Sequence, residues 1–273
     1  MLFRSAQVLI KGTAWERSLE DYAYVAALDR PGWAWEFLRR HPNYQMEWHI
    51  HKPHVPKPRL HRTGVTYCCL QQRSDAAEKW GLALFVDPQV NALELGIHWH
   101  PDVMVREVFC IAKPANNNKL STENILSFNG QTYILSAYGI EHVIIQNGVI
   151  SARLAVKGRS LLKGDCQLIY QIEGLARVNL VHETLTNLRR LKAESQLPEP
   201  PLGQTELRLR ECLVALDGHL AGRSYRDIAE VIYGPDSVKE VWANETRHLK
   251  DKVRRAVAAG IDYMNGGYLK LLQ

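Results

Sequence analysis

The sequence lacks an unbroken apolar run of the roughly 18 residues that a membrane-spanning helix requires. Its amino terminus also lacks the pattern of a secretory leader, in which a charged region precedes a long apolar run and a small-residue cleavage site. We therefore expect a soluble, cytoplasmic protein that has no membrane partner.

Cysteine is scarce, and its spacing excludes the usual cysteine-based sites. The five cysteines are an odd number, and they do not form the paired spacings typical of zinc sites. We expect reduced thiols that serve mainly as small apolar side chains. They are Cys68, Cys69, Cys110, Cys166 and Cys212.

Sequence signatures of catalysis are also missing. The chain has no glycine-rich phosphate loop, no nucleophile elbow and no His-Glu-x-x-His motif. Asp102 and Glu107 lie in strand-like surroundings, and the histidines of residues 98–100 alternate as structural strand residues do. More histidines lie among the prolines of residues 49–62, but proline keeps such a chain extended and its ligands apart. The sequence thus predicts a protein that is not an enzyme and has no metal or cofactor.

The composition is that of a folded protein with a weak excess of positive charge. Hydrophobic residues make up 46% of the 273 residues, which is enough for a buried core in two modest domains or one large one. The net charge of +5 is compatible with a nucleic-acid partner but does not require one. The placement of the charge is therefore more informative than its sum.

The first 62 residues predict a small helical domain that ends in a basic linker rich in proline and histidine. Residues 15–44 show helical spacing that is interrupted before Pro31 and that ends at Pro42. A short segment buries little surface alone, so its large apolar side chains either dock against another surface or form a small internal core. The docking candidates are Trp33, Trp35, Phe37 and Leu38.

Residues 78–200 predict a strand-rich region followed by a long helix, which makes the chain an α+β protein. Residues 81–86 and 104–111 are short apolar runs typical of strands. Asn147 and Gly148 lie between two alternating segments, which predicts an antiparallel hairpin with a type I′ turn. Apolar residues then recur at helical spacing over residues 175–191. The prolines of residues 198–201 mark a boundary inside a larger regulator domain at 78–273.

Residues 203–273 predict a helix-turn-helix with an extended turn. The first helix covers residues 205–221, and Gly222 ends it. Ser224 begins the second helix, where Asp227 completes a pair resembling a capping box. Gly234 and Pro235 end that helix, and a polar stretch separates it from a third helix that begins near residue 244 or 246.

The third helix is crowded with positive charge. Residues 247–255 hold five Lys or Arg and one Asp, a local excess of four. Arg247, Lys250 and Arg254 share an exposed face because residues three and four apart are neighbours on a helix. This face predicts contact with DNA bases and phosphates. The full set of predicted DNA-binding residues is Arg223, Ser224, Arg226, Arg247, His248, Lys250, Lys252, Arg254 and Arg255.

Two groups of motifs in this chain resemble known proteobacterial domains. The first, DRPGWAWEFLRR at residues 29–40, resembles the signature of a small domain of unknown function. The second group consists of WGL (80–82), FVDP (85–88), LDG (216–218), SYRDIA (224–229), VRR (253–255) and GGY (266–268). Together they resemble the FseA-type transcriptional activators, which switch on excision and transfer of integrative and conjugative elements. The resemblance spans most of the chain and is weakest at residues 49–77.

The resemblance implies a carboxy-terminal domain that binds promoter DNA and an amino-terminal domain that docks on its opposite side. RNA polymerase is a further candidate partner, as is a single-domain antiactivator relative that binds the amino-terminal domain. An alternative hypothesis stays open, in which the protein is itself an antiactivator or adaptor that binds another regulator instead of DNA. A purified protein without DNA affinity would favour that alternative.

Overall fold

The chain forms two compact units. The computed structural model describes residues 18–115, 122–193, 202–243 and 247–273, and only the backbone of residues 240–243 and 247. We call Met1–Tyr24 together with Gly203–Ile261 the helical unit, and Val25–Leu202 together with Asp262–Gln273 the sheet unit. The predicted domains divide the chain after residue 62. In the structure, residues 25–62 belong to the same compact unit as the sheet.

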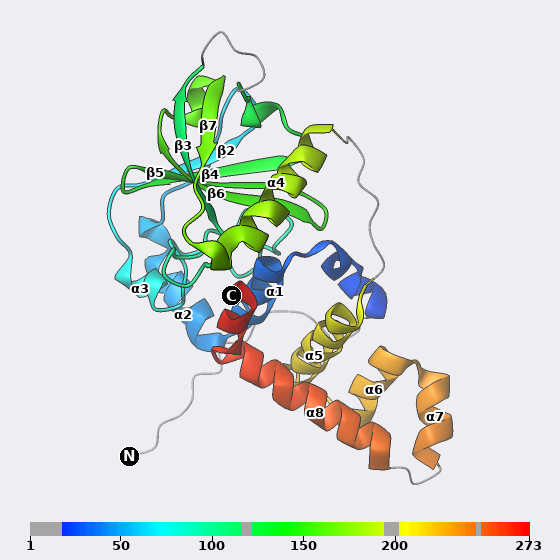
Figure 1. Cartoon of the computed structure of the whole chain (residues 1–273). Helices are drawn as coiled ribbons and strands as arrows, with labels where there is room; N and C mark the ends of the chain where they lie inside the picture. The colour runs from blue at the N-terminus through cyan, green and yellow to red at the C-terminus, as the bar shows by residue number, and fades with distance from the viewer. Residues whose placement is uncertain (1–17, 116–121, 194–201, 244–246) are drawn as a thin grey trace. The chain divides into compact units, whose positions relative to one another are not determined.

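A mixed sheet forms the centre of the sheet unit (Figure 1). Within the described residues it has seven strands, in the order β1-β2-β4-β5-β6-β3-β7. Neighbouring strands are antiparallel except in two pairs, β2 with β4 and β3 with β6. The strands are β1 (Arg59–Leu60), β2 (Thr66–Leu70), β3 (Val108–Pro114), β4 (Gln131–Ala137), β5 (Ile140–Asn147), β6 (Ile150–Gly158) and β7 (Cys166–Tyr170).

Helices lie before, between and after the strands, which confirms the predicted α+β class. Those before α5 are η1 (Leu19–Ala27), α1 (Arg30–Leu38), α2 (Pro42–His51), η2 (Lys52–His54), α3 (Asp75–Glu78), η4 (Ile125–Ser127), η5 (Leu161–Lys163), η6 (Leu175–Arg177) and α4 (Val178–Ala193). The remainder are α5 (Gln204–Leu220), α6 (Tyr225–Tyr233), α7 (Pro235–Ala243), α8 (Arg247–Met264) and η7 (Gly267–Leu272).

The long helix α4 covers one face of the sheet (Figure 1). Its buried side chains Val181, Leu188 and Leu191 join the core formed by β3, β4, β5 and β6. The prediction of an amphipathic helix here is confirmed, but its apolar stripe is only partly buried. Leu175 is 90% exposed and Leu185 36% exposed.

The opposite face of the sheet carries apolar side chains beneath residues 80–99. An aromatic cluster there joins α1, α2 and Tyr263 near the end of α8. The Phe37 and Tyr263 rings stack with centroids 4.7 Å apart, and Trp35 meets Tyr44 edge to face at 5.5 Å. Trp35 also donates a hydrogen bond to the Val90 carbonyl at 2.9 Å. The four candidate docking side chains of α1 lie in this packing, where each is at most 1% exposed.

The amino-terminal boundaries of α1 and α2 show how local chemistry sets the helices. Asp29 caps α1 by accepting a hydrogen bond from the Gly32 amide at 2.8 Å. Pro42 does not end the helical block, as the sequence suggested, but occupies the first turn of α2 behind its cap His41. Proline is favoured at that position because the first amide of a helix has no partner within the helix.

Two segments differ from their predicted structure because tertiary contacts replace local preference. Residues 49–62 are not extended throughout, since α2 and η2 continue to His54 and β1 begins at Arg59. Residues 81–86 are buried but form no named strand. The Tyr44 hydroxyl bonds the amide and carbonyl of Val86 at 3.0 and 2.7 Å, so a side chain satisfies backbone groups that a strand would pair.

The predicted β5–β6 hairpin is confirmed, but its turn is shifted by one residue. Asn147 pairs with Ile150, which leaves Gly148 and Val149 as the two loop residues. Of these, Gly148 has a positive φ of 57°. A type I′ turn needs positive φ at both positions, whereas glycine first is the pattern of type II′.

Four helices and the start of η1 make up the described part of the helical unit. Its core contains Ala215 of α5, Ile228 and Ala229 of α6, Val238 of α7 and Val253 of α8. The Tyr22 hydroxyl of η1 donates to the Asp217 carboxylate of α5 at 2.8 Å. The core therefore includes residues of all four α-helices, α5 to α8, and the sequence did not predict α7.

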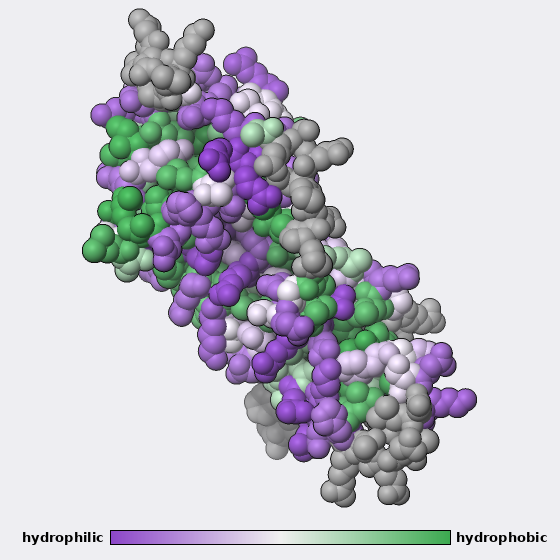
Figure 2. Space-filling model, turned by 45° about the vertical axis from the view of Figure 1, so that its right-hand side comes forward, coloured by the Kyte–Doolittle hydropathy of each residue, from purple (hydrophilic) through white to green (hydrophobic). Residues whose placement is uncertain are grey.

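Hydrophilic side chains cover most of the face drawn in Figure 2, with smaller apolar patches among them. This distribution follows from the burial of the large apolar residues described above. Of the helices in the described ranges, none is both long and apolar enough to cross a lipid bilayer.

Candidate nucleic-acid interface

The second helix of the predicted motif, α6, begins with a complete capping box. The Ser224 hydroxyl accepts from the Asp227 amide at 3.2 Å, and the Asp227 carboxylate accepts from the Ser224 amide at 3.1 Å. These bonds satisfy two amides that the helix leaves unpaired. The predicted capping pair is confirmed, so the first role of Ser224 is to stabilise the start of the helix.

The expected polar stretch after α6 is instead a helix. Gly234 separates α6 from α7 with a φ of 87°, and Pro235 opens α7. The fully buried Val238 anchors α7 to the core of the helical unit. The prediction was wrong here because Gly-Pro was taken as a stop, although proline is also well suited to the first helical position.

The basic helix α8 begins at Arg247, and its continuous apolar face packs into the core of the helical unit. Val253, Ala256 and Val257 are buried on this face. Further along, an added Cβ on Gly260 would lie 2.6 Å from the carbonyl oxygen of Cys212 on α5. This close approach fixes which side of α8 faces inward, and hence which side faces solvent.

The solvent-facing side of α8 carries the predicted cations. Lys250, Arg254 and Arg255 are exposed. Arg254 pairs with Asp251 one turn earlier at 3.2 Å, although its side chain stays 65% exposed. The Arg255 Nε atom donates to the Asp251 carbonyl at 3.3 Å. Exposed pairs of this kind are weak, so both guanidinium groups remain able to bind an anion.

Lys252 differs from its neighbours because it contributes to the packing of the unit. Its Nζ atom lies 3.3 Å from the Glu211 carboxylate of α5 and 4.5 Å from the centroid of the Tyr233 ring. Burial favours the neutral amine, but Tyr233 and Glu211 outweigh that effect and raise the Lys252 pKa above its usual value. Its side chain nonetheless stays 42% exposed, so Lys252 lies at the edge of the exposed basic face.

The other predicted DNA-binding side chains lie at helix ends. Arg223 is exposed before the cap of α6, and His248 is exposed on the first turn of α8. Arg226 pairs with Glu230 at 3.1 Å within α6. The side chain of Arg247 lies outside the described residues, so its predicted place on the basic face stays a prediction.

Lys239 is an exposed cation that the sequence analysis did not single out. It lies on α7, one residue after the buried Val238. The signal available in the sequence was Pro235 at the first helical position, with apolar residues 238, 241 and 242 at helical spacing. Across residues 203–261, the cations are nonetheless concentrated on α8.

The charge arithmetic shows how strong this concentration is. Residues 203–261 contain ten Lys or Arg and nine Asp or Glu, a net charge of +1 (10 − 9). Five of those ten cations fall within residues 247–255. Residues 203–261 are therefore nearly neutral, and half of their cations lie on two and a half turns of one helix, which makes a focused anion-binding surface.

The described side chains include no cluster that could hold a metal ion and no paired cysteines. Within the described ranges, no three His, Cys, Asp or Glu side chains are grouped so as to hold a metal ion. The five cysteines are unpaired, and Cys69 is the exposed one. Burial raises the pKa of Cys110 to about 12 and that of Cys212 to about 11, which disfavours the reactive thiolate.

Comparison with protein families gives two matches, which together span most of the sequence. Residues 15–83 match the family described as "Proteobacterial transcriptional regulator-like domain". Residues 155–273 match the family described as "T6SS, Transcription factor, DNA binding domain", and this range includes the whole of α5 to α8. No curated protein matches the chain. The two domain matches support a two-domain transcription regulator that binds DNA.

Proposed function

We propose that the first turns of α8 contact promoter DNA and that the protein acts as a transcriptional activator. The observation that carries this proposal is the exposure of Lys250, Arg254 and Arg255 on a helix held in a fixed orientation by its apolar side. Duplex DNA is a dense polyanion, and cations on one exposed helical face neutralise its phosphates or bond its base edges.

The individual side chains have different roles in this proposal. Arg254 and Arg255 supply forked donors that can bind a guanine edge or a phosphate, whereas Lys250 acts as a point charge on the backbone. Arg247 and His248 extend the same turn of α8. Arg223 and Arg226, which flank the α6 cap, are assigned to backbone phosphates.

The identity of the regulated genes rests on sequence resemblance. We propose genes for excision and transfer of an integrative and conjugative element, in the cytoplasm of the host cell. RNA polymerase and a single-domain antiactivator are proposed as protein partners on the same basis. We propose no enzymatic role, since both matched domains are of regulatory types.

The alternative role as an antiactivator or adaptor has no favouring observation among the described residues. It was motivated by the apolar side chains of α1, and these are packed inside the sheet unit. Trp33 and Phe37 would have to leave that packing before a partner could bind them.

The direct test is the salt dependence of binding to a duplex. Because phosphate neutralisation is independent of sequence, a 30-base-pair duplex of arbitrary sequence is sufficient for this measurement. Each lost phosphate contact lowers the slope of log K against log salt by about 0.9. We therefore expect Arg254→Ala and Arg255→Ala each to reduce the slope by about 1, and the double variant by about 2.

The matched control is Arg208→Ala, which removes an exposed arginine from α5 in the same unit. It should leave the slope unchanged. Equal slopes for the wild type and the Arg254/Arg255 double variant, with both proteins folded by circular dichroism, would refute the assignment of α8. Chromatin immunoprecipitation with sequencing would then identify the promoters and test the proposed target genes.

A further inference from the structure

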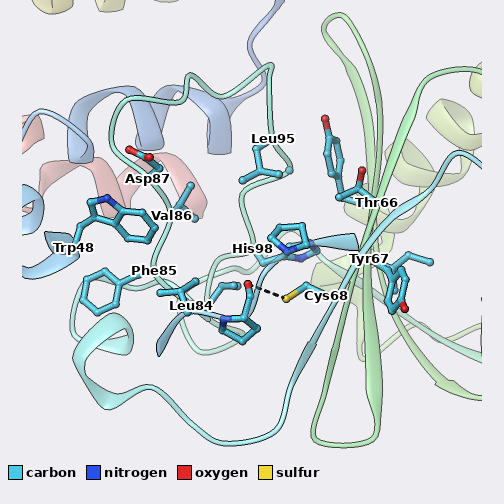
Figure 3. A pocket seen from close by; sticks show the side chains of 16 residues that line it. Trp48, Thr66, Tyr67, Cys68, Leu84, Phe85, Val86, Asp87, Leu95 and His98 are labelled. Atoms are coloured by element: carbon cyan, nitrogen blue, oxygen red, sulfur yellow. Dashed lines mark hydrogen bonds between the residues drawn. The ribbon is translucent and has the colours of Figure 1, made fainter. Parts of the chain in front are cut away.

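The sheet unit contains a pocket of about 210 Å³ on the face of the sheet opposite α4 (Figure 3). Its walls come from α2, the proline segment at residues 55–58, β2, β4 and two loop segments at residues 84–87 and 95–98. Trp48, Val86 and Asp87 lie across from Thr66, with Leu95 and His98 between them. Two prolines of the 49–62 segment, Pro56 and Pro58, therefore line the same pocket as His98.

The lining is mostly apolar, and three of its polar side chains are bonded to neighbouring residues. The Cys68 thiol donates to the Pro56 carbonyl at 3.6 Å. The Tyr133 hydroxyl donates to Gln131, and the Asp87 carboxylate accepts from the Gln89 amide at 2.9 Å. A pocket with such walls has the general properties of a small-molecule site.

Among the described residues, His98 is the imidazole that lines this pocket, and its ring is free to bond a ligand. It is 9% exposed, lines the pocket and has no hydrogen bond to its ring from any residue in the described ranges. Burial lowers its pKa well below the usual value, and the nearby charges of His142 and Arg153 lower it further. The ring is thus neutral, with one nitrogen that donates and one that accepts. A ligand that carries a hydroxyl or N–H group would satisfy it.

The size and charge of the pocket narrow the ligand class. An apolar cavity of about 150 Å³ holds benzene, so about 210 Å³ has room for a fused pair of rings. Trp48 offers an aromatic surface against which such rings can stack. No Lys or Arg lines the pocket, and Asp87 adds a negative charge, so an anionic ligand would be unfavourable.

We propose that this pocket binds a small, neutral, ring-containing molecule whose hydroxyl or N–H group hydrogen-bonds to His98. The site is independent of the DNA contacts proposed for α8, since all of its lining residues belong to the sheet unit. It gives the regulator a binding site for a small molecule in addition to its DNA surface.

The proposal is tested by isothermal titration of the full chain with 2-naphthol, a neutral two-ring molecule with one hydroxyl group. We expect saturable one-to-one binding with a Kd on the order of tens of micromolar, a typical affinity for so few ligand atoms. The carboxylate 2-naphthoate, which has the same rings, should bind at least about tenfold more weakly because its charge would be desolvated beside Asp87.

Variants of the lining separate the pocket from nonspecific binding. His98→Leu replaces the imidazole with an apolar side chain of similar size. It should weaken 2-naphthol binding by about three- to tenfold because the hydrogen bond is lost. Leu95→Trp should fill the space and abolish binding. Thr66→Phe fills it from the opposite wall, so the test does not depend on one variant folding. Ile172→Trp, at an exposed position away from the pocket, is the control and should bind as the wild type does.

Three results would overturn the proposal. The first is an absence of saturable 2-naphthol binding to the folded wild type up to about 1 mM, which is too weak for a built site. The second is unchanged affinity in both cavity-filling variants. The third is binding of 2-naphthoate that equals or exceeds that of 2-naphthol.

Discussion

Gly260 of α8 lies so close to Cys212 of α5 that a Cβ atom would be 2.6 Å from the Cys212 carbonyl oxygen and 2.9 Å from the Leu216 Cβ atom. Neither neighbour is the flexible end of a side chain, so a larger residue would force the two helices apart. We expect Gly260→Ala to lower the free energy of unfolding by about 1–3 kcal/mol, the usual cost of overpacking. Chemical denaturation of the purified protein would measure it.

The control for this prediction is Ala258→Ser, which changes an exposed position in the same turn of α8. Its effect should stay within about 0.5 kcal/mol. A Gly260→Ala variant as stable as the wild type would show that α5 and α8 do not approach each other as described.

Ser224 provides a test that separates stability from DNA recognition. Its hydroxyl accepts the Asp227 amide, so Ser224→Ala should destabilise the protein by about 1 kcal/mol through the lost cap. If capping is its main role, DNA affinity measured well below the melting temperature should change little. Ser237→Ala, an exposed serine on α7, is the control for loss of a hydroxyl. A large loss of DNA affinity in a fully folded Ser224→Ala variant would instead assign this hydroxyl to the phosphate backbone.

Lys252 and Arg255 carry the same charge on the same helix but face different surroundings. Lys252 lies against Glu211 and Tyr233, whereas Arg255 faces solvent. We expect Lys252→Ala to leave the salt slope of DNA binding unchanged and to cost at most about 1 kcal/mol of stability, since the pair is partly screened by water. Arg255→Ala should show the reverse pattern. Parallel salt titrations and denaturation curves would distinguish them.

The Asp29 carboxylate connects the α1 cap to the sheet. It accepts from Arg153 at 3.1 Å and from the Ser151 hydroxyl at 2.7 Å. Burial alone would raise its pKa, but Arg153, Ser151 and the Gly32 amide lower it below the usual 3.8. Removal of this carboxylate would leave the buried Arg153 unpaired, so Asp29→Ala should cost about 3–5 kcal/mol at neutral pH.

The sign of the pH effect at Asp29 follows from its lowered folded-state pKa. The stabilisation is complete above the unfolded pKa and is lost as the pH falls through the folded value. The difference in stability between the wild type and Asp29→Ala should therefore be constant near neutral pH and narrow below about pH 4. Asp75→Ala, at the exposed start of α3, should show no such narrowing. A constant difference down to pH 2 would contradict the pairing.

His98 should make the stability of the protein fall in mildly acidic solution. Its folded-state pKa is lowered by burial first and by the charges of His142 and Arg153 second, so the unfolded chain takes up its proton more readily. Stability is then fully present above the unfolded pKa near 6.5, and each pH unit below it costs up to about 1.4 kcal/mol. Comparison of wild type and His98→Leu by denaturation between pH 8 and pH 5 isolates this contribution. Parallel pH profiles for the two proteins would show that His98 is protonated without cost.

Local patterns in the sequence were sufficient wherever one short segment determines its own structure. The Ser224–Asp227 capping box, the end of α5 before Gly222 and the β5–β6 hairpin all follow from the preferences of a few consecutive residues. The charge excess over residues 247–255 and its exposed face follow in the same way from helical spacing. These local features are sufficient to predict a DNA-binding surface without any knowledge of tertiary contacts.

The tertiary structure decided what depends on residues far apart in the chain. Residues 81–86 form only an isolated bridge to Trp99, and the Val86 backbone is bonded by the Tyr44 hydroxyl, a contact 42 positions away. Lys252 pairs with Glu211 of α5, and no spacing along α8 reveals that contact. The pocket around His98 likewise gathers six segments between residues 48 and 134. The sequence by itself determined where the charged residues lie and how α6 is capped, because those features depend on residue type and on a few consecutive residues. Burial and pairing depend on which distant segments meet, and only the folded chain brings them together.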